Sequence, residues 1–138
     1  MIFKGYISSR PLNDNSVVDQ SIQNMVIRNS CQKRGYTYHL SATEYGMKNC
    51  FLVLNEIVKD LKLNKYQGVA FYSLSQLPKS SKIRKKIYDK SILKGKMILF
   101  SLENLLIKNK ENIKKIEEII KIQNSLKHCP KKVKLNYS

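Results

Sequence analysis

Side chains able to do chemistry gather in four short segments of this 138-residue sequence, each directly after an apolar run. The candidates in these segments are Ser8, Ser9 and Arg10; Ser41, Glu44 and Tyr45; Tyr72, Ser73 and Gln76; and Glu103. A guanidinium pairs well with phosphate or carboxylate, so Arg10 is the candidate anion-binding group. Glu44 and Tyr45 carry groups for proton transfer or hydroxyl recognition. The remaining side chains are candidates for hydrogen bonds to a polar substrate.

A catalytic role for Ser8 as a nucleophile requires an adjacent base, and Glu44 is the one candidate in the neighbouring segment. Glu44 and Glu103 would form a general acid–base pair if their loops adjoin. Simpler alternatives exist for each group. The serines are also typical turn or helix-cap residues. Arg10 could pair with a nearby aspartate on the surface, and each glutamate could be only a helix-end charge.

The sequence lacks the usual signatures of cofactor and metal sites. Five glycines form neither GxGxxG nor GxxxxGK, which rules out the standard nucleotide-binding fingerprints. Three widely spaced cysteines without a CxxC pair, and two histidines, offer neither a zinc site nor a disulfide framework. We therefore expect no metal, no cofactor and reduced thiols.

Apolar periodicity assigns the candidates to an alternation of strands and helices. Strands are predicted at 3–8, 36–40, 66–74 and 97–101, and helices at 16–33, 49–62, 81–94 and 109–126. This order predicts an α/β fold with an open, mostly parallel four-stranded sheet and helices on both faces. Ligands of such sheets bind outside the carboxyl ends of the strands, which is where the candidates fall.

The first predicted helix has two distinct stripes. Its apolar residues at helical spacing, expected to face inward, are Val18, Ile22, Met25 and Val26. A polar stripe opposite them is expected to be a solvated face and consists of Gln20, Asn24 and Arg28.

The last predicted helix has apolar residues around more of its circumference than one contact surface needs. We expect it to bury a second face in a homo-oligomer, most simply a dimer; the alternative is packing across a sheet edge. The predicted organisation is therefore an α/β domain at 1–107, followed at 108–138 by a helix and basic tail of the same domain that could serve oligomerisation.

The formal net charge of +16 comes from 26 basic and 10 acidic residues. Lysine accounts for 22 of the basic residues, whereas nucleic-acid readers favour arginine. A solvated lysine-rich surface is thus favoured over specific nucleic-acid binding. No apolar run is long enough to span a bilayer, and residues 1–6 lack a signal-peptide core. We expect a cytoplasmic protein without a membrane partner.

In length and element order the sequence resembles the catalytic domain of serine recombinases (resolvases and invertases). Their opening Tyr-x-Arg-x-Ser pattern reads Tyr6-Ile7-Ser8-Ser9-Arg10 here, with serine and arginine exchanged. Their Leu-Asp-Arg-Leu-x-Arg loop reads Leu74-Ser75-Gln76-Leu77-Pro78-Lys79, which lacks the acid and both arginines. The resemblance implies a related fold, resolvase-like or more broadly flavodoxin-like, without recombinase chemistry.

A closer resemblance is to the sporadic carbohydrate cluster protein family, found in bacterial surface-polysaccharide gene clusters. It covers roughly residues 3–106 and is carried by 5–11 (GYISSRP), Gln23-Asn24, Ile27-Arg28, 41–47 (SATEYGM) and 71–78 (FYSLSQLP). The resemblance implies a role in making or attaching an unusual sugar, without naming a reaction.

Together these observations lead to one expected function and two alternatives. We expect a protein of surface carbohydrate biosynthesis that binds or modifies an anionic sugar or sugar phosphate at the carboxyl edge of the sheet. The first alternative is a resolvase-like DNA-binding protein without the recombinase active site. The second is a non-catalytic oligomeric scaffold that uses the last helix.

Overall fold

The computed structural model describes residues 1–9, 11–13, 16–44 and 66–127, although the side chains of 40–42, 44 and 127 are not described. The chain divides into two compact units, Met1–Lys108 and Asn109–Ser138. The predicted helix at 49–62 lies outside the described residues. No helix in the described part is both long and apolar enough to cross a membrane.

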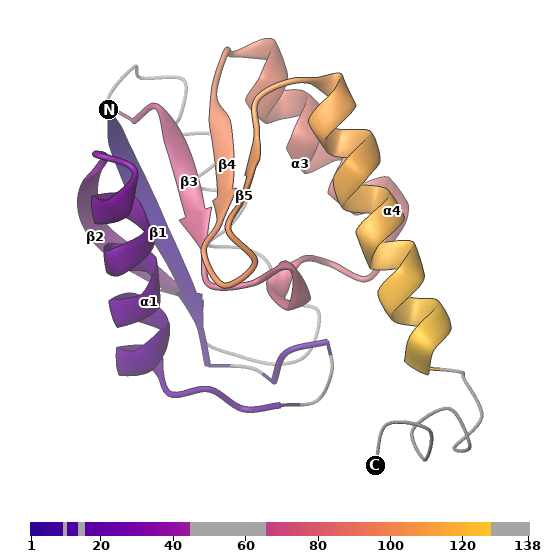
Figure 1. Ribbon diagram of the computed structural model, residues 1–138, viewed down its shortest axis with the longest axis horizontal. Helices are drawn as coiled ribbons and strands as arrows, with labels where there is room; N and C mark the ends of the chain where they lie inside the picture. The colour runs from indigo at the N-terminus through magenta and orange to yellow at the C-terminus, as the bar shows by residue number, and fades with distance from the viewer. Residues whose placement is uncertain (10, 14–15, 45–65, 128–138) are drawn as a thin grey trace. The chain divides into compact units, whose positions relative to one another are not determined.

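The first unit is built around a five-stranded sheet in the order β2-β1-β3-β4-β5 (Figure 1). Its strands are β1 (Ile2–Ser8), β2 (Thr37–Glu44), β3 (Gly68–Phe71), β4 (Met97–Phe100) and β5 (Leu105–Ile107). The first four strands are mutually parallel, and β5 runs antiparallel to β4. The expected open, mostly parallel α/β sheet is confirmed. The fifth strand escaped prediction because three residues are too few for a period-2 pattern.

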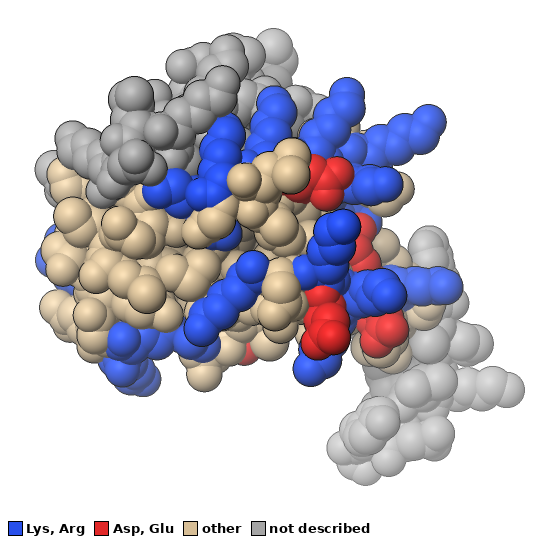
Figure 2. Space-filling view, turned by 90° about the horizontal axis from the view of Figure 1, so that it is seen from above, with Lys and Arg blue, Asp and Glu red and all other residues tan. Residues whose placement is uncertain are grey.

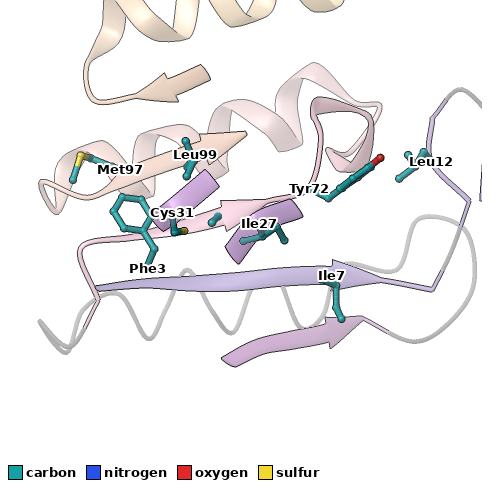
Figure 3. Close-up of a cluster of buried hydrophobic side chains, with 9 residues drawn as sticks. Phe3, Ile7, Leu12, Ile27, Cys31, Tyr72, Met97 and Leu99 are labelled. Atoms are coloured by element: carbon teal, nitrogen blue, oxygen red, sulfur yellow. The ribbon is translucent and has the colours of Figure 1, made fainter. Parts of the chain in front are cut away.

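Helix α1 (Gln20–Lys33) lies in front of the sheet in Figure 1 and α3 (Ser81–Leu93) lies behind it. Alternation along the strands supplies both faces with apolar side chains. Toward α1, Phe3, Ala70 and Leu99 form a buried cluster with two α1 residues, Ile27 and Cys31 (Figure 3). Phe71 and Phe100 follow Ala70 and Leu99 and face the other way. There the Phe71 ring contacts those of Tyr6 and Phe100 at centroid distances of 5.2 and 5.4 Å.

The buried stripe of α1 differs from the predicted one. Its buried residues are Gln23, Ile27 and Cys31, whereas Ile22 and Met25 are 43% and 56% exposed. Val18 and Val26 are partly buried against the cluster. The prediction failed because a hydrophobicity pattern does not assign an inward position to glutamine. In the fold, Gln23 is inward because its amide serves backbone groups at the end of β1.

One predicted helix and one predicted strand are shorter than expected. Helix α1 begins at Gln20 rather than at residue 16, and the predicted strand 66–74 is limited to β3 because residues 74–76 form a 3₁₀ turn, η2 (Leu74–Gln76). The bounds of α3 and of α4 (Lys110–Lys127), the described helix of the second unit, match the prediction to within one residue.

Candidate functional site

Polar residues follow the carboxyl ends of three adjacent parallel strands. Phe71 of β3 is paired in register with Tyr6 of β1 and with Phe100 of β4. Ser8 and Ser73 therefore come two residues beyond matched positions, and Glu103 comes three residues beyond one. The topology brings these three segments to one edge of the sheet, where open α/β sheets bind their ligands.

The Gln23 side chain ties the start of α1 to the end of β1. Its amide nitrogen donates to the backbone oxygens of Ser8 (2.8 Å) and Val18 (2.9 Å). Its amide oxygen accepts from the Ser8 backbone nitrogen at 3.0 Å and from the Gln76 amide nitrogen at 2.9 Å. A glutamine amide has two donor hydrogens and two acceptor lone pairs, so Gln23, which is 1% exposed, uses all of them.

Gln76 completes the same network from the β3 side. Its amide nitrogen also donates to the Ser8 hydroxyl at 3.2 Å, and its amide oxygen accepts from the backbone nitrogens of Tyr72 (2.8 Å) and Ser73 (3.3 Å). Ser73 and Gln76 form a capping box around η2, in which the Ser73 hydroxyl accepts from the Ser75 backbone nitrogen at 3.1 Å. The short sequence Ser-Leu-Ser-Gln thus fixes both side chains locally.

Glu103 places a half-buried carboxylate at this edge of the sheet. Its carboxylate accepts from the Ser73 hydroxyl at 2.7 Å and from the Leu74 backbone nitrogen at 3.1 Å. The turn that presents it continues into Asn104, whose φ of 55° lies in the left-handed region that asparagine tolerates. An ionised carboxylate offers about four acceptor positions, so these two bonds leave capacity for a ligand hydroxyl or amine.

The Ser101 hydroxyl lies near the same edge and is buried without a hydrogen-bond partner among the described residues. Its backbone nitrogen donates to the Phe71 carbonyl at 3.0 Å, which fixes it beside the end of β3. Ser101 was not among the sequence candidates. Its exposed fraction and its missing partner are properties of the fold that residue type alone does not signal.

Five of the sequence candidates come together in this network. Ser8, Ser73, Gln76 and Glu103 take part through side chains, and Tyr72 takes part through its backbone nitrogen. The Tyr72 ring is 8% exposed and packs in the α1-side cluster near Leu12 (Figure 3). The Ser8 hydroxyl, the candidate nucleophile, belongs to a residue that is 1% exposed.

The other sequence candidates follow β1, belong to β2 or lie outside the described residues. Ser9 is exposed. Ser41 and Glu44 belong to β2, and Glu44 is paired in register with Ser8, which puts it at the same edge. Strands β1 and β3 separate β2 from β4, so the loops that carry Glu44 and Glu103 do not start from neighbouring strands. Arg10 and Tyr45 lie outside the described residues.

Cys31 belongs to the buried face of α1. Burial raises the pKa of the Cys31 thiol to about 11, which keeps it protonated and unreactive at neutral pH. Within the described residues, no group of three or more His, Cys, Asp or Glu side chains could hold a metal ion.

The most informative residue that sequence reasoning did not select is Gln23. It was noted in the carbohydrate-cluster resemblance but not chosen as a site residue. One feature of the sequence could have identified it: Gln23, Ile27 and Cys31 are spaced four residues apart, so they lie on one face of a helix. The structure buries that face.

Comparison with solved structures shows a resolvase-like fold. The N-terminal catalytic domain of TP901-1 integrase superposes with a TM-score of 0.61 at 13% identity, over 91% of this chain and 97% of that chain. A resolvase family site-specific recombinase from Streptococcus pneumoniae gives a TM-score of 0.63 at 14% identity, over 91% of each chain. No protein-family model and no curated protein sequence matches the chain. The resolvase-like layout is confirmed, and the carbohydrate-cluster resemblance stays a prediction.

Proposed function

We propose that this protein binds an anionic sugar or sugar phosphate at the carboxyl edge of the sheet, in a pathway of bacterial surface carbohydrate synthesis. The observation that carries the proposal is the buried hydrogen-bond network that holds the half-buried Glu103 carboxylate at that edge. A rigid carboxylate with unused acceptor positions suits the hydroxyl groups of a sugar ring.

The network also explains how such a site would keep its shape. Gln23 and Gln76 bond to each other and to Ser8, so three chain segments far apart in the sequence share one set of hydrogen bonds. Fully satisfied buried networks are rigid, and rigidity limits the entropy lost on binding. Arg10, two residues beyond β1, is the proposed partner of the ligand's anionic group.

The proposal is tested by the melting temperature of the full chain with glucose 1-phosphate, glucose 6-phosphate, UDP-glucose or inorganic phosphate. Ligands that bind only the folded state raise the melting temperature with concentration. We expect a rise with at least one sugar phosphate that exceeds the rise with inorganic phosphate. Arg10→Ala and Glu103→Gln should each abolish that rise. Lys33→Ala, on the exposed last turn of α1, is the control for a lost positive charge and should leave it intact.

The absence of a shift with every sugar phosphate and with UDP-glucose would contradict the proposal. An equal loss in Arg10→Ala and Lys33→Ala would also contradict it, because binding would then follow overall charge rather than a site.

A second candidate function, DNA binding, is favoured by the resolvase-like fold and by the distribution of charge. Residues 79–96 carry eight basic residues and one acidic residue. Four lysines on α3 are exposed: Lys82, Lys85, Lys86 and Lys90. Figure 2 shows basic side chains over much of the face seen from above, with few acidic ones among them. Such a surface would contact the phosphate backbone rather than base edges.

Salt dependence separates this candidate from general attraction to polyanions. Each phosphate contact adds about 0.9 to the slope of log affinity against log salt concentration. We expect fluorescence anisotropy with labelled duplex DNA to give a slope that falls when Lys82 and Lys86 are both changed to glutamine. Loss of all affinity near 0.15 M salt would contradict a DNA-binding function.

A further inference from the structure

A concave site lies away from the carboxyl edge, between α1 and the start of β2. It is an open pocket of about 470 Å³ lined by Arg28, Gln32, Tyr36, Thr37 and Tyr38. This volume falls in the range of about 300–1,000 Å³ that is typical of small-molecule sites. Thr37 is paired with Ile2 at the first position of β1, whereas Ser8 and Glu44 are paired at the last. Six residue steps along β1, about 20 Å, therefore separate the start of β2 at the pocket from the carboxyl edge.

The two tyrosine rings of the pocket are held by contacts behind them. The Tyr36 ring stacks on Phe3 with centroids 4.5 Å apart and planes 10° apart. The Tyr38 hydroxyl donates to the Asn24 side-chain oxygen. Both tyrosines are half-buried, so each ring keeps part of its surface accessible. Fixed, partly exposed aromatic rings are suitable surfaces for stacking by a flat ligand group.

Arg28 contributes a positive charge whose hydrogen-bond donors are unused. Its guanidinium carbon lies 5.4 Å from the centroid of the Tyr38 ring, a cation–π arrangement. The side chain is exposed, and no hydrogen bond or ion pair engages it among the described residues. A guanidinium held over a ring keeps the N–H groups along its edge free to pair with an anion. Arg28 is thus exposed, as expected for the polar stripe of α1, and both Asn24 and Arg28 of that stripe contact Tyr38.

Gln32 completes the set of groups. Its exposed amide has both a donor and an acceptor, and no hydrogen bond engages it within the described part of the chain. The edge of a nucleobase presents the same alternation of donors and acceptors. A sugar phosphate would use Arg28 and the Gln32 amide, but it has no planar ring to stack on a tyrosine.

From these groups we infer that the pocket binds a nucleoside phosphate: the base stacks on a tyrosine ring with its edge at Gln32, and the phosphate pairs with Arg28. The chemistry recognised is one base–sugar–phosphate unit, supplied either as a free nucleotide or as part of a single strand. The site uses side chains of α1 and β2 rather than a glycine-rich loop. It is independent of the function proposed for the carboxyl edge.

Isothermal titration calorimetry of the full chain with UMP and AMP tests the inference. Uridine, ribose 5-phosphate and inorganic phosphate separate the base from the phosphate contribution, and labelled oligo(dT) of eight nucleotides represents the single strand. A charge-assisted hydrogen bond is worth about 1.5–3 kcal/mol, so Arg28→Gln should weaken binding of the nucleotide at least about tenfold. The control Lys33→Gln removes the same charge from an exposed position of the same helix and should change affinity less than about twofold.

Binding of UMP or AMP that is stronger than binding of ribose 5-phosphate and sensitive to Arg28→Gln supports the inference. Oligo(dT) that binds more tightly than UMP, with the same sensitivity, identifies a single strand as the source; equal or weaker binding identifies the free nucleotide. No binding of either nucleotide at millimolar concentration overturns the inference. Equal weakening by Arg28→Gln and Lys33→Gln, or ribose 5-phosphate binding as tightly as UMP, also overturns it. Glu103→Gln should leave nucleotide affinity unchanged, which keeps this test separate from that of the carboxyl edge.

Discussion

Two buried glutamines join β1, α1 and η2 through hydrogen bonds that leave neither side-chain amide with an unused donor or acceptor. Gln23 alone bonds four groups: both backbone groups of Ser8, the Val18 carbonyl and the Gln76 amide. A buried polar group left without a partner costs more free energy than a formed hydrogen bond contributes. The free energy of unfolding should therefore depend strongly on these two side chains.

Replacing Gln23 with leucine tests this dependence. The shape changes little, but four groups lose a partner, three of them in buried hydrogen bonds, so we expect the free energy of unfolding to fall by about 2–4 kcal/mol. Urea unfolding followed by circular dichroism measures the change. Gln32→Leu is the same substitution at an exposed position of the same helix and should cost less than about 0.5 kcal/mol. Equal costs for the two variants would show that the network contributes little to stability.

Cys31 makes a prediction about alkaline pH. Burial raises its pKa from 9.0 to about 11, so the folded protein keeps the thiol proton while the unfolded chain releases it above pH 9. The contribution of this thiol to stability is thus complete below pH 9 and is lost progressively between pH 9 and about 11. The stability difference between the wild type and Cys31→Ala should narrow over that window, as measured by urea unfolding. A constant difference would contradict the raised pKa, because tyrosine and lysine titration is common to both proteins.

At the scale of elements, the contact between β3 and β4 depends on a missing side chain. A Cβ atom at the buried Gly68 would collide with the Met97 carbonyl oxygen and lie 2.7 Å from Cε2 of Phe3. Strand pairing in this region therefore requires glycine. We expect Gly68→Ala to lower the free energy of unfolding by about 3 kcal/mol, since overpacking a buried site typically costs about 1–3 kcal/mol and backbone cannot move aside easily.

The control for Gly68→Ala is Gly35→Ala. Gly35, after α1, has a φ of +73° with nothing within 4 Å of an added Cβ. Its substitution should cost only the left-handed backbone preference, about 1 kcal/mol. Thermal or urea unfolding of both variants gives the comparison. A Gly68→Ala protein as stable as Gly35→Ala would show that β3 and β4 are not as close as the structure places them.

Sequence pattern was sufficient for the elements whose burial is apolar. β4 and α3 were predicted nearly to the residue, because four apolar residues in a row indicate a strand buried on both faces and Gly95 follows the helix as a stop. Sequence pattern was insufficient for the inward stripe of α1. Gln23 takes an inward position because its amide hydrogen-bonds to chain segments remote in sequence. The three-residue β5 depends on a turn through Asn104 that residue type does not specify.

The candidate site, like the fold, was predictable from the sequence only in part. The carboxyl edge was predictable, because parallel strands deliver their following loops to one side, and Ser8, Ser73, Gln76 and Glu103 do lie there. The pairing of Ser73 with Glu103 was not predictable, since it requires both the capping box of η2 and the exact turn after β4. Sequence pattern also could not show that Asn24 and Arg28 contact Tyr38.

At the scale of the whole molecule, two kinds of surface are open to partners. The exposed lysines of α3 suit polyanions, and α4 carries exposed apolar residues, with Ile122 at 59% and Leu126 at 60% exposure. Exposed large apolar side chains at i and i+4 on one helix form a stripe that association can bury. This stripe is the physical basis for expecting a homodimer through the last helix.

Sedimentation velocity at micromolar concentration tests that expectation. The chain has a mass of 16.1 kDa, so a dimer sediments as a species of twice that mass. Changing Ile122 and Leu126 together to lysine should give monomers, because association would then bury charge in place of apolar surface. Gln123→Lys introduces a charge at an exposed position of the same helix and should leave the dimer intact if the apolar stripe is what associates. A wild-type protein that sediments as a monomer throughout would mean that α4 is stable with this stripe in water, since single exposed apolar residues are common on monomers.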